Sequence, residues 1–144
     1  MNNFVENIFL GRELHQTMLA PVCEKHNMTH TEMVILLFLA SNPKLNTATD
    51  IVKNRRMTKS SVSMSVRNLQ DRGLISGEFV DGNHRTIHLS ICNTANQIIK
   101  EAEEAQNKYF AILSDGFSEE DLEKFRGYFE RVSENIKAYY YKTV

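Results

Sequence analysis

The 144-residue chain has few of the residues that mark special structural classes. Its six glycines and two prolines are too few for a disordered chain or a fibrous repeat. Two cysteines cannot form a disulfide framework, so a reducing cytoplasm is the simplest compartment. The longest apolar run, Met33 to Ala40, is much shorter than the roughly 20 residues of a membrane helix. Residues 1–11 lack the cationic start of a secretory signal. We therefore expect a folded cytoplasmic protein that does not associate with membranes.

Catalytic and cofactor motifs are missing as well. The sequence has no glycine-rich phosphate loop, no Gly-x-Ser-x-Gly and no His-Glu-x-x-His, so we expect no enzyme and no cofactor. The candidate metal ligands lack the tight spacing of a structural zinc site, and we expect no metal. These candidates are His15, Cys23, Glu24, His26 and His30. A metal sensor, or an oxidant sensor at Cys23, stays an alternative.

Charge is unevenly distributed along the nearly neutral chain, which has 17 Lys and Arg against 18 Asp and Glu. From Lys53 to Arg85 seven bases stand against three acids, whereas the remainder has ten bases and fifteen acids. The middle of the chain is therefore basic and lies between acidic ends. Basic segments attract phosphate groups, although chance clustering on a solvated surface explains this feature equally well when it is taken alone.

The first third of the chain predicts three helices. An apolar stripe at helical spacing covers the N-terminal residues, and Pro21 near its end is expected to bend or terminate that helix. Thr29 with Glu32, and Thr47 with Asp50, have the spacing of capping boxes, which start two further helices. The stripe of the first helix comprises Phe4, Ile8, Phe9, Leu14, Met18 and Val22.

A fourth helix and a hairpin follow. Thr58 can cap the helix, and Gly73 stands where a left-handed residue would end it. Its expected buried positions are Val62, Val66 and Leu69. The apolar period then changes to that of two strands, with segment 81–85 between them. That segment begins with Asp-Gly, a hairpin signal because glycine tolerates a positive φ. An isolated hairpin is marginal in water, so this one should pack on the helices.

Two long helices close the chain. Ser118 with Asp121 starts the second of them, and its apolar residues recur every three or four positions, as in a coiled-coil seam. Such a seam needs a partner, either the first helix of the same chain or a second subunit. We expect both, in an intertwined dimer. The expected dimer contacts are Phe4, Ile8, Tyr109, Ile112, Phe125, Phe129, Val132, Ile136 and Tyr139.

One face of the fourth helix carries small hydroxyls and cations. Its members recur every three or four residues: Lys59, Ser60, Ser63, Arg67 and Gln70. Serine can bond phosphates or base edges, lysine neutralises phosphate, and arginine can bind guanine through two hydrogen bonds. The backbone N–H groups of residues 58–61 can also hold a phosphate at the helix start. This face indicates a helix that reads DNA, and the alternative is a poorly optimised surface helix.

Four segments, in their order and spacing, resemble the MarR (multiple antibiotic resistance regulator) family of winged-helix regulators. They are Asn46–Lys53 before the recognition helix, Thr58–Ser63 at its start, Leu69–Ile75 at its exit, and Asp81 with Arg85 in the wing. The resemblance implies a mainly α fold with a small β-hairpin, a winged helix-turn-helix flanked by N- and C-terminal dimerisation helices. It implies a homodimer with recognition helices in successive major grooves, wings in minor grooves, and an effector pocket between the two lobes. The resemblance assigns residues 1–28 to the N-terminal dimerisation helix and residues 29–92 to the winged helix-turn-helix DNA-binding lobe. Residues 93–144 are the expected C-terminal dimerisation helices.

We therefore expect a dimeric, sequence-specific DNA-binding transcriptional regulator, a repressor of a pseudo-palindromic operator that a small ligand releases. The expected contacts to double-stranded DNA are Arg55, Arg56, Thr58, Lys59, Ser60, Ser61, Ser63, Met64, Arg67, Asn83, His84 and Arg85. Either core packing or an apolar effector pocket accounts for Phe9, Met18, Met33 and Leu37. The alternative function is a winged-helix protein–protein adaptor without a DNA target. An acidic residue on the hydroxyl-rich face would favour it, and none falls there.

Overall fold

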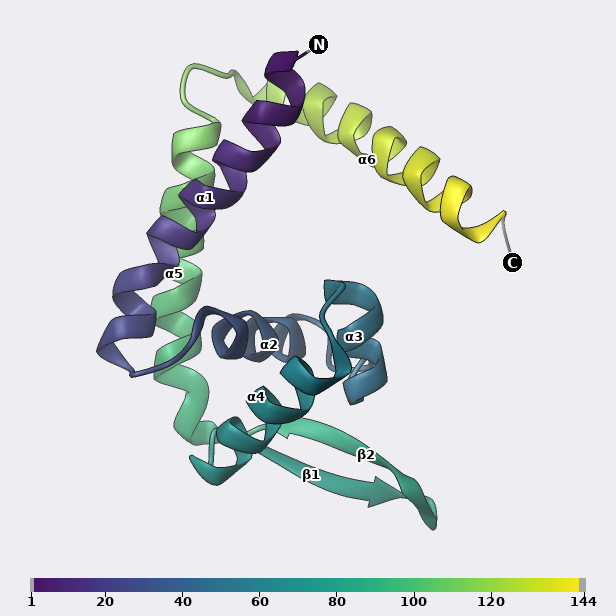
Figure 1. Cartoon of the computed structure of the whole chain (residues 1–144). Helices are drawn as coiled ribbons and strands as arrows, with labels where there is room; N and C mark the ends of the chain where they lie inside the picture. The colour runs from purple at the N-terminus through teal and green to yellow at the C-terminus, as the bar shows by residue number, and fades with distance from the viewer. Residues whose placement is uncertain (1, 143–144) are drawn as a thin grey trace. The chain divides into compact units, whose positions relative to one another are not determined.

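The computed structural model describes residues 2–142, which form the helices and the single hairpin of a mainly α winged-helix protein (Figure 1). They divide into an N-terminal unit that ends at Tyr109 and a C-terminal unit that begins at Phe110. The elements are α1 (Asn2–Lys25), α2 (His30–Ser41), α3 (Ala48–Arg55), α4 (Lys59–Asp71), β1 (Ile75–Val80), β2 (Asn83–Ile91), η1 (Asn93–Ala95), α5 (Asn96–Leu113) and α6 (Glu119–Tyr141). No helical segment among residues 2–142 has the combination of length and hydropathy that a bilayer crossing demands.

Local capping starts the helices where the sequence predicts. The side chains of Thr29 and Thr47 each accept a hydrogen bond from the backbone N–H three residues on, and the carboxylates of Glu32 and Asp50 accept from the N-cap backbone in return. Ser118 caps α6 in the same reciprocal way. Each cap stabilises its helix by about 1 kcal/mol. The three predicted capping boxes are therefore confirmed.

Pro21 is expected from the sequence to bend or to terminate the first helix. Termination is wrong, because α1 continues to Lys25 with Pro21 inside it. An interior proline costs about 3 kcal/mol in a helix without tertiary support. Here Leu19 and Cys23 on either side of Pro21 are buried in the core, at 0% and 8% exposure. Burial of this last turn outweighs the proline penalty, and the helix stops only at the turn that follows.

The core of the N-terminal unit surrounds α2. Met33, Ile35 and Leu36 are fully buried there, and α1, α4 and β2 pack against this helix. From α4, Val62 and Leu69 are buried as predicted, but the intervening core position is Ser65 rather than Val66, which is only half-buried. Three- and four-residue spacings are equally helical, so the local pattern could not choose between these two positions. The packing of α4 against its neighbours decided it.

The hairpin is a two-stranded antiparallel sheet with a tighter turn than expected. The loop predicted over residues 81–85 consists only of Asp81 and Gly82, and Asn83–Arg85 belong to β2. Both turn residues have positive φ, 54° and 71°, as a two-residue hairpin turn of right-handed strands requires. Phe79 pairs with Ile87 but Val80 pairs with Asn83, so the register shifts beside the turn. The additional, unpaired residues of this irregularity lie on β2.

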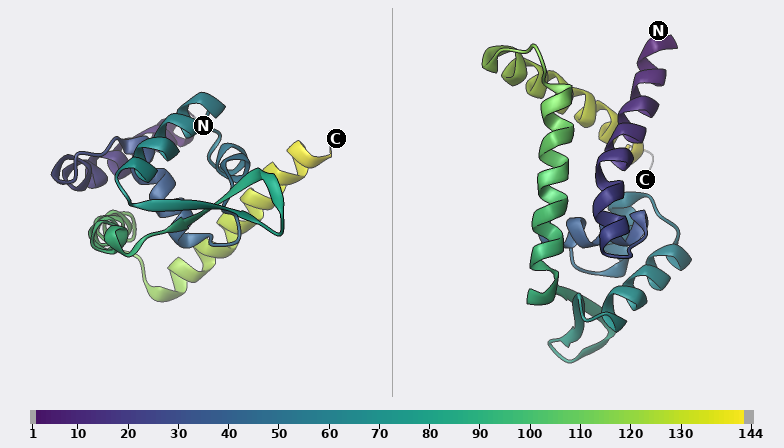
Figure 2. Two further views of the ribbon diagram at one scale, coloured as in Figure 1. Left: turned by 90° about the horizontal axis from the view of Figure 1, so that it is seen from below. Right: turned by 90° about the vertical axis from the view of Figure 1, so that its left-hand side faces the viewer.

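Residues of α5 before Tyr109 complete the core of the N-terminal unit. Ile98, Ala102 and Ala105 on α5 are buried, and α1 runs alongside in the opposite direction, as Figures 1 and 2 show. The C-terminal unit differs, because α6 contains no buried residue. Three of its rings stand in a row, with centroids of Phe117 and Phe125 6.4 Å apart and those of Phe125 and Phe129 6.0 Å apart. The predicted division at residues 28/29 and 92/93 into functional segments stays a prediction.

Candidate nucleic-acid interface

The start of α4 is organised by the side chain of Thr58. Its hydroxyl accepts a hydrogen bond from the Ser61 N–H at 3.2 Å and lies 3.3 Å from the hydroxyl of Ser60. The expectation that all N–H groups of residues 58–61 are open to a phosphate is therefore wrong for Ser61, whose N–H the cap already uses. The cap holds the helix end rigid and leaves Lys59 and Ser60 exposed beside it.

An exposed stripe runs along α4, formed by Ser60, Ser63, Met64 and Arg67. These residues follow each other at positions i, i+3, i+4 and i+7, so they share one side of the helix. Met64 is 66% exposed, which is unusual for a large apolar side chain. The sequence prediction also included Gln70, but its side chain is half-buried against the hairpin, where a Cβ at Gly77 would lie 2.8 Å from its amide nitrogen.

The cations expected after α3 differ in their surroundings. The guanidinium of Arg55 lies over the ring of Phe38 with its carbon 4.9 Å from the ring centroid, a geometry that holds the cation in place while it stays exposed. Arg56 is the C-cap of α3 in a left-handed conformation, with φ of 53°. Both side chains are exposed to solvent. The loop before α4 thus presents positive charge next to its N-terminal end.

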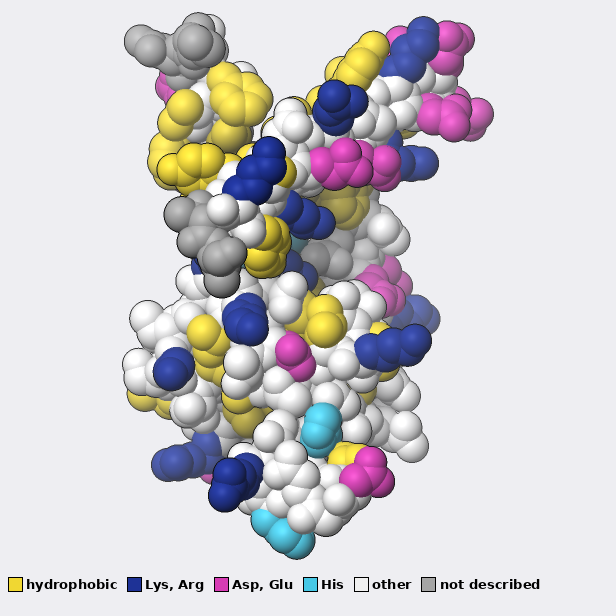
Figure 3. Space-filling view, turned by 90° about the vertical axis from the view of Figure 1, so that its right-hand side faces the viewer, with side chains coloured by type: hydrophobic (Ala, Val, Ile, Leu, Met, Phe, Trp, Pro, Cys, Tyr) yellow, Lys and Arg dark blue, Asp and Glu magenta, His cyan; other side chains and the backbone are white. Residues whose placement is uncertain are grey.

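The hairpin, which we call the wing, carries Asn83, His84 and Arg85 at its exposed tip. The Asn83 side chain accepts a hydrogen bond from the Arg85 N–H at 2.9 Å, and the ring of His84 meets that of Phe79 edge-on at 5.1 Å. Figure 3 shows this part of the surface at the bottom of the view, where Lys or Arg, His, and Asp or Glu side chains all lie among uncharged polar ones. The tip is therefore a structured projection on which Arg85 supplies a cation close to the acidic Asp81.

Two contacts that the sequence did not predict fix the base of the wing. The ring nitrogen Nδ1 of His88 lies 2.8 Å from Oδ1 of Asn46, so Nδ1 carries the proton and donates it. The Leu89 N–H donates to the carbonyl oxygen of Asn46, also at 2.8 Å. Asn46 precedes Thr47, the N-cap residue of α3, and lies 42 residues from His88 in the sequence. No local pattern links residues so far apart, and only the fold brings them together.

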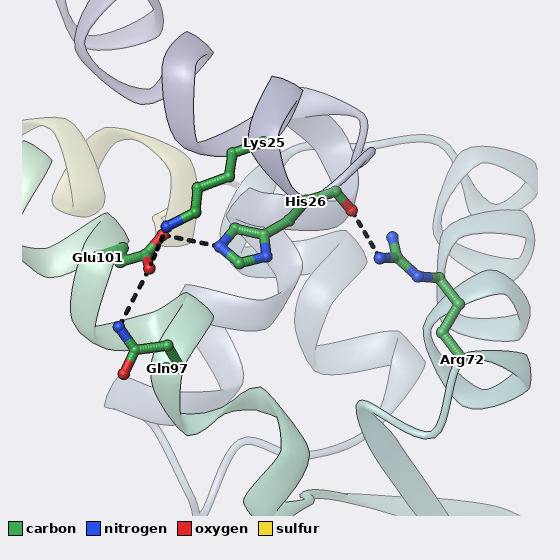
Figure 4. A network of polar contacts seen from close by, with 5 residues as sticks. All are labelled: Lys25, His26, Arg72, Gln97 and Glu101. Carbon is green, nitrogen blue, oxygen red and sulfur yellow. Dashed lines mark hydrogen bonds and ion pairs between the residues drawn. The ribbon is translucent and has the colours of Figure 1, made fainter.

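A polar network at the other end of α4 was also missed. Arg72 donates to two backbone carbonyls after α1, and Glu101 on α5 receives hydrogen bonds from Lys25, Gln97 and His26 (Figure 4). These bonds, that of Lys25 foremost, lower the pKa of Glu101 to about 2. The carboxylate is thus ionised throughout the physiological range, and the network joins α1, α4 and α5.

The four residues expected either in the core or around an effector divide between two environments. Met33 and Leu37 are core residues at 0% and 8% exposure, Met18 is half-buried, and Phe9 is 64% exposed. A hollow of about 500 Å³ lies away from these four residues, in the C-terminal unit. Its lining includes Asp115, Phe117, Lys124 and Tyr128. The effector site therefore stays a prediction.

The sensing alternatives gain no support from the side-chain environments. Burial, with a smaller contribution from the charge of Glu32, raises the pKa of the Cys23 thiol, which disfavours the reactive thiolate. Burial also lowers the pKa of His15 and of His30, whose rings lie 6.4 Å apart. Residues 2–142 contain no cluster of three or more metal-ligating side chains.

The residues expected at a dimer interface are mostly uncovered in the single chain. Tyr109 is half-buried, with its ring 5.1 Å from that of His15. The others range from 44% to 74% exposure: Phe4, Ile8, Ile112, Phe125, Phe129, Val132, Ile136 and Tyr139. Large exposed apolar side chains are typical of surfaces that contact another molecule, and the dimer contacts stay a prediction.

Comparisons with known proteins agree with this geometry. Residues 26–86 match the sequence profile of the MarR family. A MarR family transcriptional regulator from Listeria monocytogenes, complexed with 26mer DNA, has 17% identity and a TM-score of 0.80, with 92% of this chain and 87% of that chain covered. No curated protein matches the chain in sequence.

Two structures from Staphylococcus aureus are similar as well. A complex of MepR with DNA has 18% identity and a TM-score of 0.72, covering 94% of this chain and 96% of that chain. A MarR in complex with salicylate and kanamycin has 17% identity and a TM-score of 0.76, covering 94% of this chain and 91% of that one. At these identities the structural likeness establishes the fold.

Proposed function

We propose, from the match of residues 26–86 to the MarR family profile, that the chain is a transcriptional regulator of this family. In this proposal it binds a specific duplex DNA sequence as a homodimer and represses transcription there until a small molecule releases it. One observation carries the proposal above all. The stripe of Ser60, Ser63, Met64 and Arg67 is exposed along α4, whose N-terminal end is capped by Thr58.

Affinity and specificity come from different parts of this surface. Lys59, Arg55, Arg56 and Arg85 supply positive charge for phosphates, and releasing counterions from DNA makes such binding fall steeply with salt. The α4 stripe enters the major groove, where Arg67 can bind guanine through two hydrogen bonds and serine hydroxyls can bond base edges. Arg85 at the wing tip reaches the minor groove, whose negative potential attracts arginine.

A twofold pair of chains accounts for the uncovered apolar residues. The exposed residues of α6, Phe125, Phe129, Val132 and Ile136, repeat at the three- and four-residue spacing of a helix-packing seam. A symmetric dimer places two recognition helices on one face of the duplex, so the half-sites lie about 10 base pairs apart. A ligand that binds better to a dimer with a different helix spacing weakens DNA binding by that preference. Salicylate is bound by one of the related structures, and a small aromatic acid is a reasonable first ligand to test.

Selection of bound sequences from random duplex DNA, with purified protein, tests the proposal. We expect a near-palindromic consensus with half-sites about one turn apart. Arg67→Ala should weaken binding to that consensus by about 1–3 kcal/mol, and Lys100→Ala, which removes an exposed cation from α5, should not. Failure to enrich any sequence, or equal effects of the two substitutions, would overturn the proposal. A protein partner whose affinity alone responds to Arg67→Ala would favour the adaptor function.

A further inference from the structure

Helix α4 ends in a turn that leaves Arg72 at a defined position. The Gly73 N–H donates to the Gln70 carbonyl at 2.9 Å and the Leu74 N–H donates to the Leu69 carbonyl at 3.0 Å. Gly73 has φ of 68°. This pair of bonds with a left-handed glycine is a Schellman motif, in which Arg72 is the C-cap residue. The side chain of Arg72 therefore starts from the last, well-ordered turn of the recognition helix.

Helix α1 ends in the same motif with Asn27 in place of glycine. Asn27 has φ of 50°, its N–H donates to Glu24 at 3.1 Å, and the Met28 N–H donates to Cys23 at 2.8 Å. The carbonyls of His26 and Asn27 lie past the helical hydrogen-bond ladder and need partners from elsewhere. The guanidinium of Arg72 donates a hydrogen bond to each of these carbonyls, at 2.6 Å to that of His26 and at 3.0 Å to that of Asn27. The planar fork of arginine matches two neighbouring acceptors, which an ammonium group cannot do.

His26 passes this connection on to α5. Its carbonyl receives Arg72, while its ring nitrogen Nε2 lies 2.7 Å from the carboxylate of Glu101 (Figure 4). Glu101 also accepts from Lys25 at 2.7 Å and from Gln97 at 3.1 Å, and its side chain is only 17% exposed. We call the chain of contacts Arg72–His26–Glu101 the relay. It connects the C-terminal end of α4 to the first turns of α5.

A second contact shows why the relay matters for geometry. The hydroxyl of Thr94, just before α5, donates to the Gly73 carbonyl at 2.5 Å. Residues of α4 and α5 also belong to one apolar core, and two polar contacts at different places add resistance to rotation of one helix against the other. Helix α4 has 13 residues, so a tilt of about 10° at its C-terminal end would move its N-terminal end by about 3 Å. That displacement is comparable to the roughly 3.4 Å rise between base pairs.

We propose that Arg72 and Glu101 are positioning residues for DNA binding: the relay holds α4 at a set angle to α5 and thereby sets the spacing of the two recognition helices in the dimer. The inference rests on the proposed function, because α5 carries the expected dimer contacts Tyr109 and Ile112. Neither relay residue lies on the α4 stripe, and neither contacts DNA in this account. Their effect on operator recognition acts through the placement of α4.

The test measures binding to the selected operator and to operators whose half-sites are moved by one or two base pairs. The wild type should bind the shifted operators at least about tenfold less tightly, since half-site spacing follows from rigid dimer geometry. Arg72→Met and Glu101→Gln should reduce that spacing penalty to about threefold or less, and Arg72→Lys should resemble Arg72→Met because lysine lacks the fork. Lys100→Met, on the same helix as Glu101 but outside the relay, should keep the wild-type penalty. An unchanged penalty in the relay variants, or a wild-type penalty in Arg72→Lys, would overturn the proposal.

Hydrogen exchange gives a readout that needs no DNA. If the relay holds α4, Glu101→Gln should speed up hydrogen exchange of the backbone amides at the C-terminal end of α4. These include the Arg72 amide, which donates to the Asn68 carbonyl in the wild type. If exchange becomes faster only in α5, the relay does not connect α5 to α4 and the proposal is wrong. If Arg72→Met does not fold, Glu101→Gln carries both measurements. If the wild type binds no duplex at all, the proposed function fails, and the exchange experiment still decides whether α4 and α5 are coupled.

Discussion

The exposed methionine of the α4 stripe leads to the sharpest prediction about base recognition. Met64 is 66% exposed and lies between Ser63 and Arg67 on the side of α4 proposed to enter the major groove. Its thioether side chain offers almost nothing to a hydrogen-bonding base edge. The one apolar feature that bases present in that groove is the 5-methyl group of thymine. We therefore expect each half-site to contain a thymine whose methyl group contacts Met64.

The magnitude follows from the apolar area of a single methyl group. Removing it by replacing thymine with deoxyuridine keeps all base-pair hydrogen bonds and costs about 0.8 kcal/mol of apolar burial. That is about a fourfold loss of affinity per half-site, and about fifteenfold when both half-sites are changed. The serine and arginine contacts remain, so the salt dependence of binding should not change.

The assay is a double-mutant cycle in protein and DNA. Wild type and Met64→Ala are titrated with the selected operator and with the same operator carrying deoxyuridine at the candidate thymine. Met64→Ala should weaken binding to the thymine operator and be nearly insensitive to the substitution. Met64→Leu, which keeps an apolar side chain of similar size, should retain part of the sensitivity. If wild type and Met64→Ala lose the same factor with deoxyuridine, the methyl group does not contact Met64 and the reasoning is refuted.

Three further predictions concern the folded chain itself. Asn68→Ala removes the amide that donates to the buried Glu32 carboxylate at 3.0 Å, and should lower the free energy of unfolding by about 1–3 kcal/mol in a urea titration. The pKa of Glu101 falls from an ordinary 4.5 to about 2 in the folded state, so its contribution is complete above pH 4.5 and disappears as pH falls towards 2. Unfolding followed by circular dichroism should therefore show less loss of stability between pH 5 and pH 2 in Glu101→Gln than in wild type. An alkylating reagent should modify Cys92 in the native protein before Cys23, since burial raises the pKa of the Cys23 thiol; equal rates would contradict that assignment.

Interactions within a few residues were readable from the sequence. The capping boxes at Thr29, Thr47 and Ser118 form between residues three apart, and the Asp-Gly turn needs only its own two residues. Such features depend on backbone geometry over one turn of chain, which the local residues determine by themselves. The exposure of the α4 stripe was predictable for the same reason, since the opposite side of that helix is apolar.

Packing decided the rest, because several local solutions had nearly equal energy. Pro21 could end α1 or lie within it, and burial of the following turn kept the helix intact. Ser65 and Val66 were alternative core positions on α4, and the neighbouring helices selected Ser65. The contact of Arg72 with His26 joins residues 46 apart in sequence, and that of His26 with Glu101 joins residues 75 apart. A hydrogen bond between distant residues depends on where the fold brings their atoms, so only the tertiary structure could reveal this connection.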